Sequence, residues 1–352
     1  MKIIEFLKRK TFKYWIDIYL YNNDIVFPIV RNGNGWRPYA LLLLILPYLL
    51  IKYFFIKVYE NIYGFGKTYR IMEEEKKKNF MYELAVVTCS KDESLYLLEW
   101  IEFYRLMGVD HIYFYDNGST DDTKALLKPY VDMDYVTYTY IDGRGKQLEA
   151  YNDALVLGKE KCRWMAFIDM DEYIVPIDSN RKILDVINDI IGGADAGAAG
   201  IAVNWATYGT SGHAKRPKGL ITHNYTKRAS DTHFINKHIK TICNPRMVQF
   251  YISPHYPFYK RGAFSVFEFS GHKQMGWATS ECHYKKLRIN HYMTKSAEDY
   301  MAKCRRGLGD REENYLFDSL KKADYNDVED TIAWRYSDEL LKRMNAYLKV
   351  TK

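Results

Sequence analysis

The stretch RWMAFIDMDEYIVP, residues 163–176, places three acidic side chains, Asp169, Asp171 and Glu172, between two apolar runs. Carboxylates this close to one another and to a core repel each other and lose hydration, so a positive group is expected among them. In an extended chain residues i and i+2 share a face, so Asp169 and Asp171 can address one ion. Such oxygen ligands suit Mg²⁺ or Mn²⁺. The pattern predicts a divalent-cation site, with an exposed acidic turn as the alternative.

A second polar motif, YFYDNGSTDDT, covers residues 113–123. Asp116 ends a strand-like run and precedes a turn that contains Gly118. An acidic residue in this position accepts hydrogen bonds from a base or a ribose hydroxyl at nucleotide sites of related architecture. An Asx turn followed by a helix cap gives the same pattern. The later acidic pair favours the nucleotide interpretation.

The elements that must position these motifs follow from the hydrophobic spacing of residues 83–169. Short apolar runs predict strands over 83–89, 111–117, 134–141 and 164–169. Helical spacing predicts three intervening helices: one with Leu97, Trp100, Ile101 and Tyr104 that ends at Gly108, one that runs from a cap at Ser119 or Thr120 to Pro129, and one with Leu148, Tyr151, Asn152 and Leu155 on one face. The alternation predicts an α/β fold, a mostly parallel sheet with helices on both faces.

In parallel sheets of this kind, ligands bind beyond the carboxyl ends of the strands. The predicted strand ends carry Thr88, Asp116, Asp142 and Asp169. After the small-residue stretch 192–200 the pattern becomes irregular until about residue 290. Ser296 and Asp299 then predict a capping box, and 324–349 predicts a long C-terminal helix. We therefore expect an N-terminal segment over 1–80, a catalytic domain over 81–312 and a helical extension over 313–352.

The charge distribution points to a membrane surface and away from nucleic acid. The net charge is +7, and residues 1–80 hold 14 Lys and Arg against 7 Asp and Glu, while the other 272 residues are balanced. A basic N-terminal segment suits acidic lipid. The five cysteines are scattered without a CxxC spacing, which indicates a reducing compartment. We expect a protein at the cytoplasmic face of a membrane.

The apolar run 39–51 is too short to cross a bilayer alone. An extension to residue 59 includes Lys52 and Lys57, whose stems can snorkel, and Pro47 would kink the helix. Three interpretations stay open: an in-plane or re-entrant membrane helix, a buried core helix, and a true span.

Four motifs in order resemble a known family. VVTCSKDE, YDNGSTDD, QLEAYNDAL and FIDMDEYI resemble the successive motifs of GT-A glycosyltransferases, specifically family 92 and its bacterial family 2-like relatives. Downstream, YGTSGH, KHIKTICNP and INHYMTKSAEDYMAKCRRG are similar to the second half of that group, so the resemblance covers about 83–310. It implies the Rossmann-like GT-A fold and sugar transfer from a nucleotide-diphosphate sugar, usually UDP-linked with a divalent metal, to a hydroxyl acceptor.

The resemblance also implies roles for individual residues. Thr88, Glu93 and Asp116 would hold the nucleoside. Asp169 would face both ribose and metal, and Asp171 would bind the metal with His291 as a third ligand. A neutral imidazole is a competent ligand for Mn²⁺, though less suited to Mg²⁺.

Other polar residues are candidates for contact with the donor. Gln147 and Asn152 would contact the donor sugar or pyrophosphate, or else form a buried polar pair. Lys240 would stabilise the negative charge of the departing diphosphate, or else lie exposed on a strand. Lys295 and either Arg305 or Arg306 are further candidates for that task.

An inverting reaction also needs a general base. The residues themselves leave Glu281, Asp231 and His213 as candidates, and the resemblance favours Glu281, because many GT-A enzymes place a carboxylate downstream of the acidic pair. The expected activity is transfer of a hexose to a glycan or lipid-linked acceptor in cell-surface polysaccharide assembly.

Two other functions fit parts of the pattern. In a phosphohydrolase Asp169 would be the nucleophile and Asp171 the acid, but Tyr173 stands where such a motif carries Thr. A non-catalytic nucleotide-sugar binder or membrane scaffold would keep the fold with a decayed site.

Overall fold

The computed structural model describes residues 66–267, 273–274, 276–282, 284–306 and 320–350, together with 47, 48 and 51. The chain divides into two compact units, Met1–Lys67 and Thr68–Lys352, and the features below belong to the second. Most of the expected membrane-associating segment 1–80, including nearly all of the run 39–59, lies outside the described residues. Across the described ranges, no helix has both the length and the apolar character that a membrane crossing requires.

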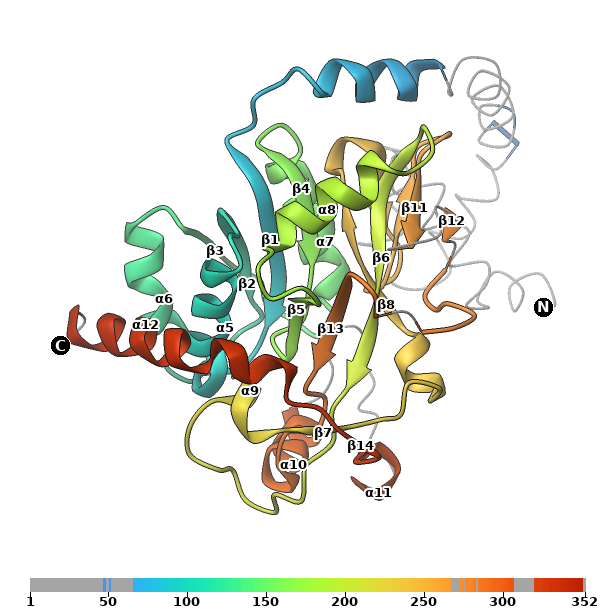
Figure 1. The fold of residues 1–352 in the computed structure, drawn as a ribbon. Helices are drawn as coiled ribbons and strands as arrows, with labels where there is room; N and C mark the ends of the chain where they lie inside the picture. Colours follow the sequence, from blue (N-terminus) through green and yellow to red (C-terminus); the bar gives the residue numbers. More distant parts are fainter. Residues whose placement is uncertain are drawn as a thin grey trace. The chain divides into compact units, whose positions relative to one another are not determined.

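The first half of the central sheet is parallel, as the alternation of strands and helices predicts. Its strands are β1 (Tyr82–Ser90), β2 (His111–Asp116), β3 (Val136–Tyr140) and β4 (Cys162–Phe167). β1 lies between β4 and β2, and β3 forms the edge. The carboxyl ends of these strands therefore meet at one edge of the sheet, at the bottom of the view in Figure 1.

The second half of the sheet is mixed. The path continues from β4 through β8 (Ile239–Cys243), β6 (Ala198–Thr207) and β11 (Phe264–Phe267) to β12 (Lys273–Gln274). β8 runs antiparallel to both β4 and β6. β13 (Leu287–His291) joins β6 in parallel and β5 (Glu172–Pro176) in antiparallel pairing. The mostly parallel α/β class is confirmed, with β8 inserted in the opposite direction.

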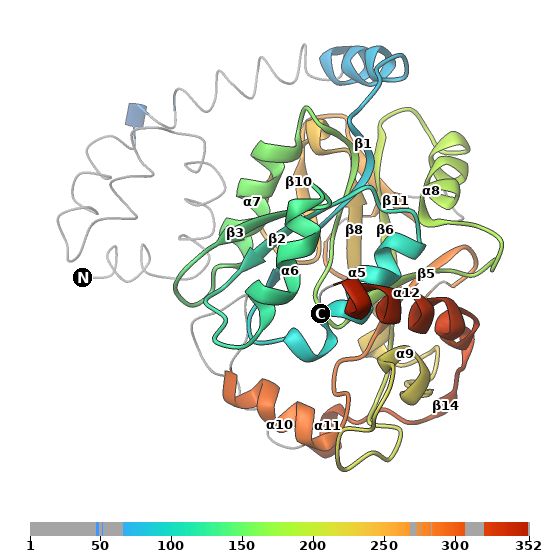
Figure 2. The same ribbon diagram turned by 90° about the vertical axis from the view of Figure 1, so that its left-hand side faces the viewer.

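Helices cover both faces of the sheet (Figure 2). One face packs against α5 (Ser94–Leu106), α6 (Thr123–Asp132), α8 (Ile183–Gly192) and α12 (Ser337–Val350). The other face packs against α7 (Gln147–Gly158) and the small sheet of β9 (Val248–Tyr251) and β10 (Pro257–Tyr259). In β1, Leu84 and Val86 enter the first core while Ala85 and Val87 enter the second, because successive strand side chains point to opposite faces.

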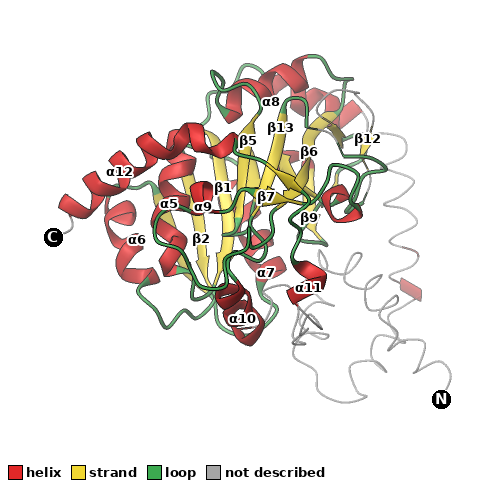
Figure 3. Ribbon diagram, turned by 60° about the horizontal axis from the view of Figure 1, so that its bottom comes forward, coloured by secondary structure: helices red, strands yellow, loops and turns green. Residues whose placement is uncertain are grey.

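Shorter elements complete the described part of the fold. They are α9 (Ile221–Asn224), η1 (Phe234–Lys237), η2 (Pro245–Met247), α10 (Ala297–Arg306), α11 (Leu320–Ala323), η3 (Ile332–Tyr336) and the pair β7 (Lys227–Arg228) and β14 (Val328–Glu329). Figure 3 shows α10 and α11 beyond the ends of the sheet strands. Both helices come from the last fifth of the chain, and Arg306 of α10 donates to the carbonyl of Asp92 in the loop that follows β1.

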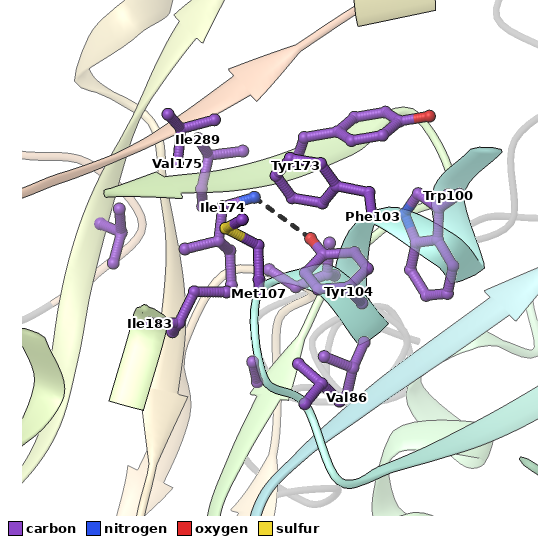
Figure 4. Packing of buried hydrophobic residues seen from close by; sticks show 14 of the residues in the cluster. Val86, Trp100, Phe103, Tyr104, Met107, Tyr173, Ile174, Val175, Ile183 and Ile289 are labelled. Atoms are coloured by element: carbon purple, nitrogen blue, oxygen red, sulfur yellow. Dashed lines mark hydrogen bonds between the residues drawn. The ribbon is translucent and has the colours of Figure 1, made fainter. Parts of the chain in front are cut away.

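α5 holds the start of β5 through two aromatic side chains. Tyr104 Oη donates to the carbonyl of Glu172 over 3.0 Å and accepts from the backbone N–H of Ile174 over 3.2 Å, and Trp100 Nε1 donates to the same carbonyl over 3.1 Å. Figure 4 shows the Tyr104–Ile174 contact inside the apolar core. Because the acidic turn ends where β5 begins, this clamp fixes one side of that turn.

The structure corrects two of the expected helices. α6 begins at Thr123, after an N-cap at Asp122, so Ser119 and Thr120 do not cap it; Ser119 N–H instead donates to Asp116. The expected helix 324–349 consists of β14, η3 and then α12. The capping box at α10 is confirmed, because Ser296 Oγ accepts from the backbone N–H of Asp299 over 3.1 Å and the backbone N–H of Ser296 donates to Asp299 Oδ2 over 3.3 Å.

Candidate active site

The acidic motif forms a turn between β4 and β5. β4 ends at Phe167 and β5 begins at Glu172, so Asp169 and Asp171 lie between two buried strands. The backbone N–H of Asp169 donates to Glu172 Oε2 over 2.9 Å, and the carbonyl of Asp171 accepts from the N–H of Tyr292 over 2.8 Å. Because the backbone on both sides is held, the two carboxylates have defined directions.

A pocket of about 600 Å³ opens above this turn at the carboxyl ends of β1 to β4. Residues at or just after those ends line it, including Ser90, Asn117 and Arg144. One part of the lining, here named the charged wall, consists of Lys91, Glu93, Arg144, Asp169, Asp171, Lys240, Lys303, Arg306 and Lys322. Another part, named the aromatic wall, consists of Trp205, Phe234, His238 and His255.

Asp169 is held by polar partners on two elements. Its Oδ2 accepts from Lys240 Nζ over 2.8 Å, and its Oδ1 accepts from Gln147 Nε2 over 2.5 Å and from Tyr151 over 3.2 Å. Lys240 is 1% exposed and also lies 3.5 Å from Glu172. Burial alone would lower the pKa of Lys240, but Asp169 and Glu172 outweigh it and raise that pKa. Lys240 is therefore a charged group on a buried strand of the pocket, and the alternative of an exposed strand position is wrong.

Asp171 contacts a different cation. Its Oδ2 accepts from Lys303 Nζ of α10 over 2.6 Å, and its Oδ1 lies 3.5 Å from His291 Nε2 at the end of β13. Burial opposes ionisation, but Lys303 and His291 hold the pKa of Asp171 well below its usual value. Burial also lowers the pKa of His291, which favours the neutral imidazole. Asp171 is thus a carboxylate at neutral pH.

Glu93 forms ion pairs at the pocket edge. Arg306 Nη2 donates to its Oε1, and Lys295 Nζ lies 3.4 Å from its Oε2. The Glu93 carboxylate is therefore engaged with two cations of the C-terminal part. Its direct effect in the structure is to position Arg306 in the pocket lining.

The residues fit a divalent cation in donor chemistry. Asp171 Oδ1 and His291 Nε2 are oxygen and nitrogen donors of the type Mn²⁺ accepts, and they lie 3.5 Å apart. Nδ1 of His291 is buried without a hydrogen-bond partner among the described residues, whereas Nε2 faces the Asp171 carboxylate, where an ion would take the place of a proton. Within the described ranges no three His, Cys, Asp or Glu side chains converge as a preformed ion cluster. In their place, Lys240 and Lys303 neutralise the two aspartates.

The aromatic wall surrounds the indole of Trp205 with imidazoles. Its ring centroid lies 4.9 Å from His238, 5.3 Å from His255 and 4.3 Å from His291. Nδ1 of His255 lies 2.9 Å from the carbonyl of Ile239, and Nδ1 of His238 lies 2.9 Å from the carbonyl of Ile235. A carbonyl only accepts, so each Nδ1 carries the proton and each Nε2 carries a lone pair.

Four of the predicted site residues are not brought to the pocket lining. Thr88 is fully buried in β1, and Asp116 accepts from Ser119 N–H and Tyr138 Oη. The side chain of Asn152 pairs with the backbone N–H and carbonyl of Tyr251, as the buried polar alternative has it. Glu281 is exposed and outside the lining. Asn117, directly after Asp116, is the β2 residue that lines the pocket.

The alternative candidates divide in the same way. His213 Nε2 faces the carbonyl of Asn224, and Asp231 pairs with Arg228, both outside the lining. Of the two adjacent arginines, Arg306 lines the pocket and Arg305 does not. No carboxylate offered as general base therefore lies in the lining.

Sequence reasoning missed Lys303, Arg144 and most of the aromatic wall. Lys303 stands three residues before Arg306 in the motif SAEDYMAKCRRG. In a helix that spacing puts both side chains on one face, which is the signal that could have identified Lys303. Arg144 stands in the turn DGRGK after a predicted strand end, which is a position for ligand contact. Trp205 and His255 carry no such local signal, because they come from irregular sequence that only the fold brings together.

This architecture defines a class: an α/β protein with a ligand pocket at the carboxyl ends of its parallel strands, where acidic and basic side chains alternate. The chain belongs to glycosyltransferase family 92, whose family model matches residues 85–343. The resemblance seen in the motifs is confirmed, and family membership favours a glycosyltransferase over a phosphohydrolase.

Curated relatives carry the same family description. A glycosyltransferase family 92 protein of Oryza sativa subsp. japonica is 28% identical over 148 residues, covering 42% of this chain and 25% of the relative. One of Arabidopsis thaliana is 27% identical over 196 residues, covering 53% of this chain and 32% of the relative. The matched part thus spans about a quarter to a third of the length of these relatives.

Solved structures show partial likeness. S. aureus TarS 1-349 in complex with UDP-GlcNAc has a TM-score of 0.34 at 13% identity, covering 75% of this chain and 73% of that chain. Glucosyl-3-phosphoglycerate synthase from Mycobacterium tuberculosis in complex with Mn²⁺, UDP and glucosyl-3-phosphoglycerate has a TM-score of 0.24 at 20% identity, covering 35% of this chain and 44% of that chain.

Proposed function

We propose that this chain transfers a hexose from a nucleotide-diphosphate sugar, with UDP as the nucleotide, to a hydroxyl of a glycan or lipid-linked acceptor. The observation that carries the proposal is the charge of the pocket. Six cationic side chains line it against three carboxylates, at the sheet edge where α/β proteins bind nucleotides. Membership of glycosyltransferase family 92 supports sugar transfer as the reaction.

The cations have two kinds of task in this reaction. Lys91 and Arg144 are exposed at the ends of β1 and β3, where they attract and orient the diphosphate. Lys303 and Arg306 project from one helix, so they can stabilise the negative charge that develops on the leaving diphosphate. Lys240 instead holds the Asp169 side chain through an ion pair of 2.8 Å.

A divalent cation fits this proposal. Asp171 and His291 would hold Mn²⁺ or Mg²⁺, with Asp169 as the adjacent carboxylate, and the ion would neutralise the diphosphate. Lys303 Nζ donates to Asp171 Oδ2 over 2.6 Å in this structure, so an ion bound by Asp171 would share its carboxylate with that ammonium group.

Isothermal titration calorimetry with UDP, with and without Mn²⁺, tests the donor site. We expect Mn²⁺ to tighten UDP binding and Asp171→Asn to abolish that gain. Asp195→Asn, at an exposed aspartate outside the pocket, is the matched control and should leave it unchanged. A screen of donor hydrolysis across nucleotide sugars then identifies the sugar.

The other outcomes separate the rival functions. Turnover of p-nitrophenyl phosphate without use of any nucleotide sugar would support a phosphohydrolase. Binding of UDP without hydrolysis or transfer across the donor panel would support a non-catalytic binder.

A place at the cytoplasmic face of a membrane belongs to the same proposal. It is supported by the excess of Lys and Arg in residues 1–80. Flotation of the full chain with vesicles that contain phosphatidylserine tests it, and equal recovery with purely zwitterionic vesicles would argue against the electrostatic part.

A further inference from the structure

The aromatic wall has a composition that the donor does not explain. Its four residues come from β6, from η1 with the residue after it, and from the loop between β9 and β10. None of them is ionised in the way that the charged wall is, because burial lowers the pKa of both His238 and His255. A diphosphate therefore gains nothing from this side of the pocket.

Both imidazoles belong to the pocket lining and carry a hydrogen-bond acceptor. The Nδ1–H groups of His238 and His255 donate to the carbonyls of Ile235 and Ile239, so each Nε2 carries a lone pair. Neither Nε2 has a hydrogen-bond partner among the described residues. A buried or half-buried acceptor without a donor is costly unless a ligand or water supplies the hydrogen. The matching ligand carries hydroxyl groups.

The same wall presents apolar surface. Phe234 lines the pocket while 65% exposed, and Trp277, 53% exposed, extends the strip by packing 4.8 Å from His238. Exposed aromatic rings beside a polar pocket are typical of sites that bind ligands with one apolar face. Pyranose rings have such a face of C–H groups, and hydroxyls around their edge.

The wall also adjoins the reaction centre. Trp205 packs 4.3 Å from His291, and His291 lies 3.5 Å from Asp171. A molecule on this wall is therefore next to the group that holds the donor's diphosphate end. We propose that Trp205, Phe234, His238 and His255 form the acceptor subsite, and that the acceptor is a neutral pyranoside whose ring lies against this wall and whose hydroxyls donate to the two imidazoles.

This inference rests on the proposed function, because it assigns the second substrate of the same site. Saturation-transfer NMR on the full chain with UDP and Mn²⁺ tests it. The probes are the p-nitrophenyl β-pyranosides of glucose, galactose, mannose, N-acetylglucosamine, xylose and fucose. We expect at least one of them to receive saturation at its ring C–H protons.

Two substitutions separate contact from folding. His255→Asn keeps an amide donor near the Ile239 carbonyl but removes the Nε2 acceptor, and Phe234→Ala removes the exposed ring. Each should weaken pyranoside binding about fivefold to tenfold, while UDP affinity stays within twofold. Leu95→Ala, at a 66% exposed apolar residue outside the pocket lining, is the matched control and should change neither.

The outcomes distinguish the two proposals. UDP binding without saturation of any pyranoside, or saturation of the nitrophenyl group alone, would overturn the acceptor subsite and leave the donor site standing. Pyranoside binding without UDP binding would support the subsite and overturn the donor assignment. Loss of UDP affinity in His255→Asn equal to the loss of pyranoside affinity would show that the wall has no separate ligand.

Discussion

On the charged wall, each of the three carboxylates has an ammonium or guanidinium group as a partner, whereas the aromatic wall presents imidazoles whose Nδ1 atoms face backbone carbonyls. The two walls share one pocket and meet at His291, which contacts both Asp171 and Trp205. In the proposed reaction, this difference would let one cavity bind an anionic donor and a neutral acceptor. The cations of the charged wall would attract the anionic ligand. The uncharged rings of the aromatic wall would not bind that ligand and would stay available for the neutral one.

The largest expected effect comes from the charged wall. Asp171→Asn should reduce sugar transfer about a thousandfold, because it removes the carboxylate proposed to hold the divalent cation that neutralises the leaving diphosphate. Pyranoside binding should stay within twofold, since none of the four residues of the aromatic wall contacts Asp171 within the described part of the chain. Initial rates and saturation-transfer NMR measure the two effects. A parallel loss of both would break the distinction between the walls.

The second effect concerns stability. Lys240→Met leaves Asp169 and Glu172 without their shared cation, and Glu172 is fully buried. We expect the free energy of unfolding to fall by about 3 kcal/mol, as when one partner of a buried ion pair is removed. Urea denaturation measures it. Lys146→Met, at a half-exposed pair with Glu149, is the control and should cost below about 1 kcal/mol.

Because the imidazoles of the aromatic wall are uncharged in the folded chain, the free energy of unfolding should depend on pH through His255. Burial lowers the pKa of His255 to about 3, with Lys240 as the next cause, whereas an ordinary histidine titrates at 6.5. Between those values the unfolded chain binds a proton that the folded chain does not, so this residue's contribution to stability is lost as the pH falls.

Urea denaturation at pH 7.5 and pH 5 measures that contribution. The wild type should lose about 2 kcal/mol more than His255→Asn over this range. Equal losses in both proteins would show that His255 is not held neutral by the fold.

The smallest effect is expected at the pocket mouth. Arg144→Ala should weaken UDP binding about fivefold at low salt and less at high salt, because exposed charges are screened. Calorimetry at two ionic strengths measures it, and Lys215→Ala, at an exposed lysine outside the lining, is the control. A loss that persists at high salt would mean that Arg144 is a closer contact than its exposure indicates.

The sequence determined the elements of the first half of the sheet and the position of the acidic turn. β1 to β4 and the helices between them follow from local periodicity, because a buried strand or an amphipathic helix repeats its apolar residues within a few positions. Asp169, Asp171, Gln147, Lys240 and His291 were predicted to share a site, and all five line the pocket.

The tertiary structure sets which cation pairs with which carboxylate and which residues form the aromatic wall. Lys303 reaches Asp171 across 132 positions of the chain, and β8 enters the sheet antiparallel between β4 and β6. Such contacts depend on how distant segments pack, and the local spacing of apolar residues carries no information about that packing. The same reason explains why Glu281, placed by resemblance alone, lies outside the pocket, and why Trp205 and His255, which carry no local signal, lie inside it.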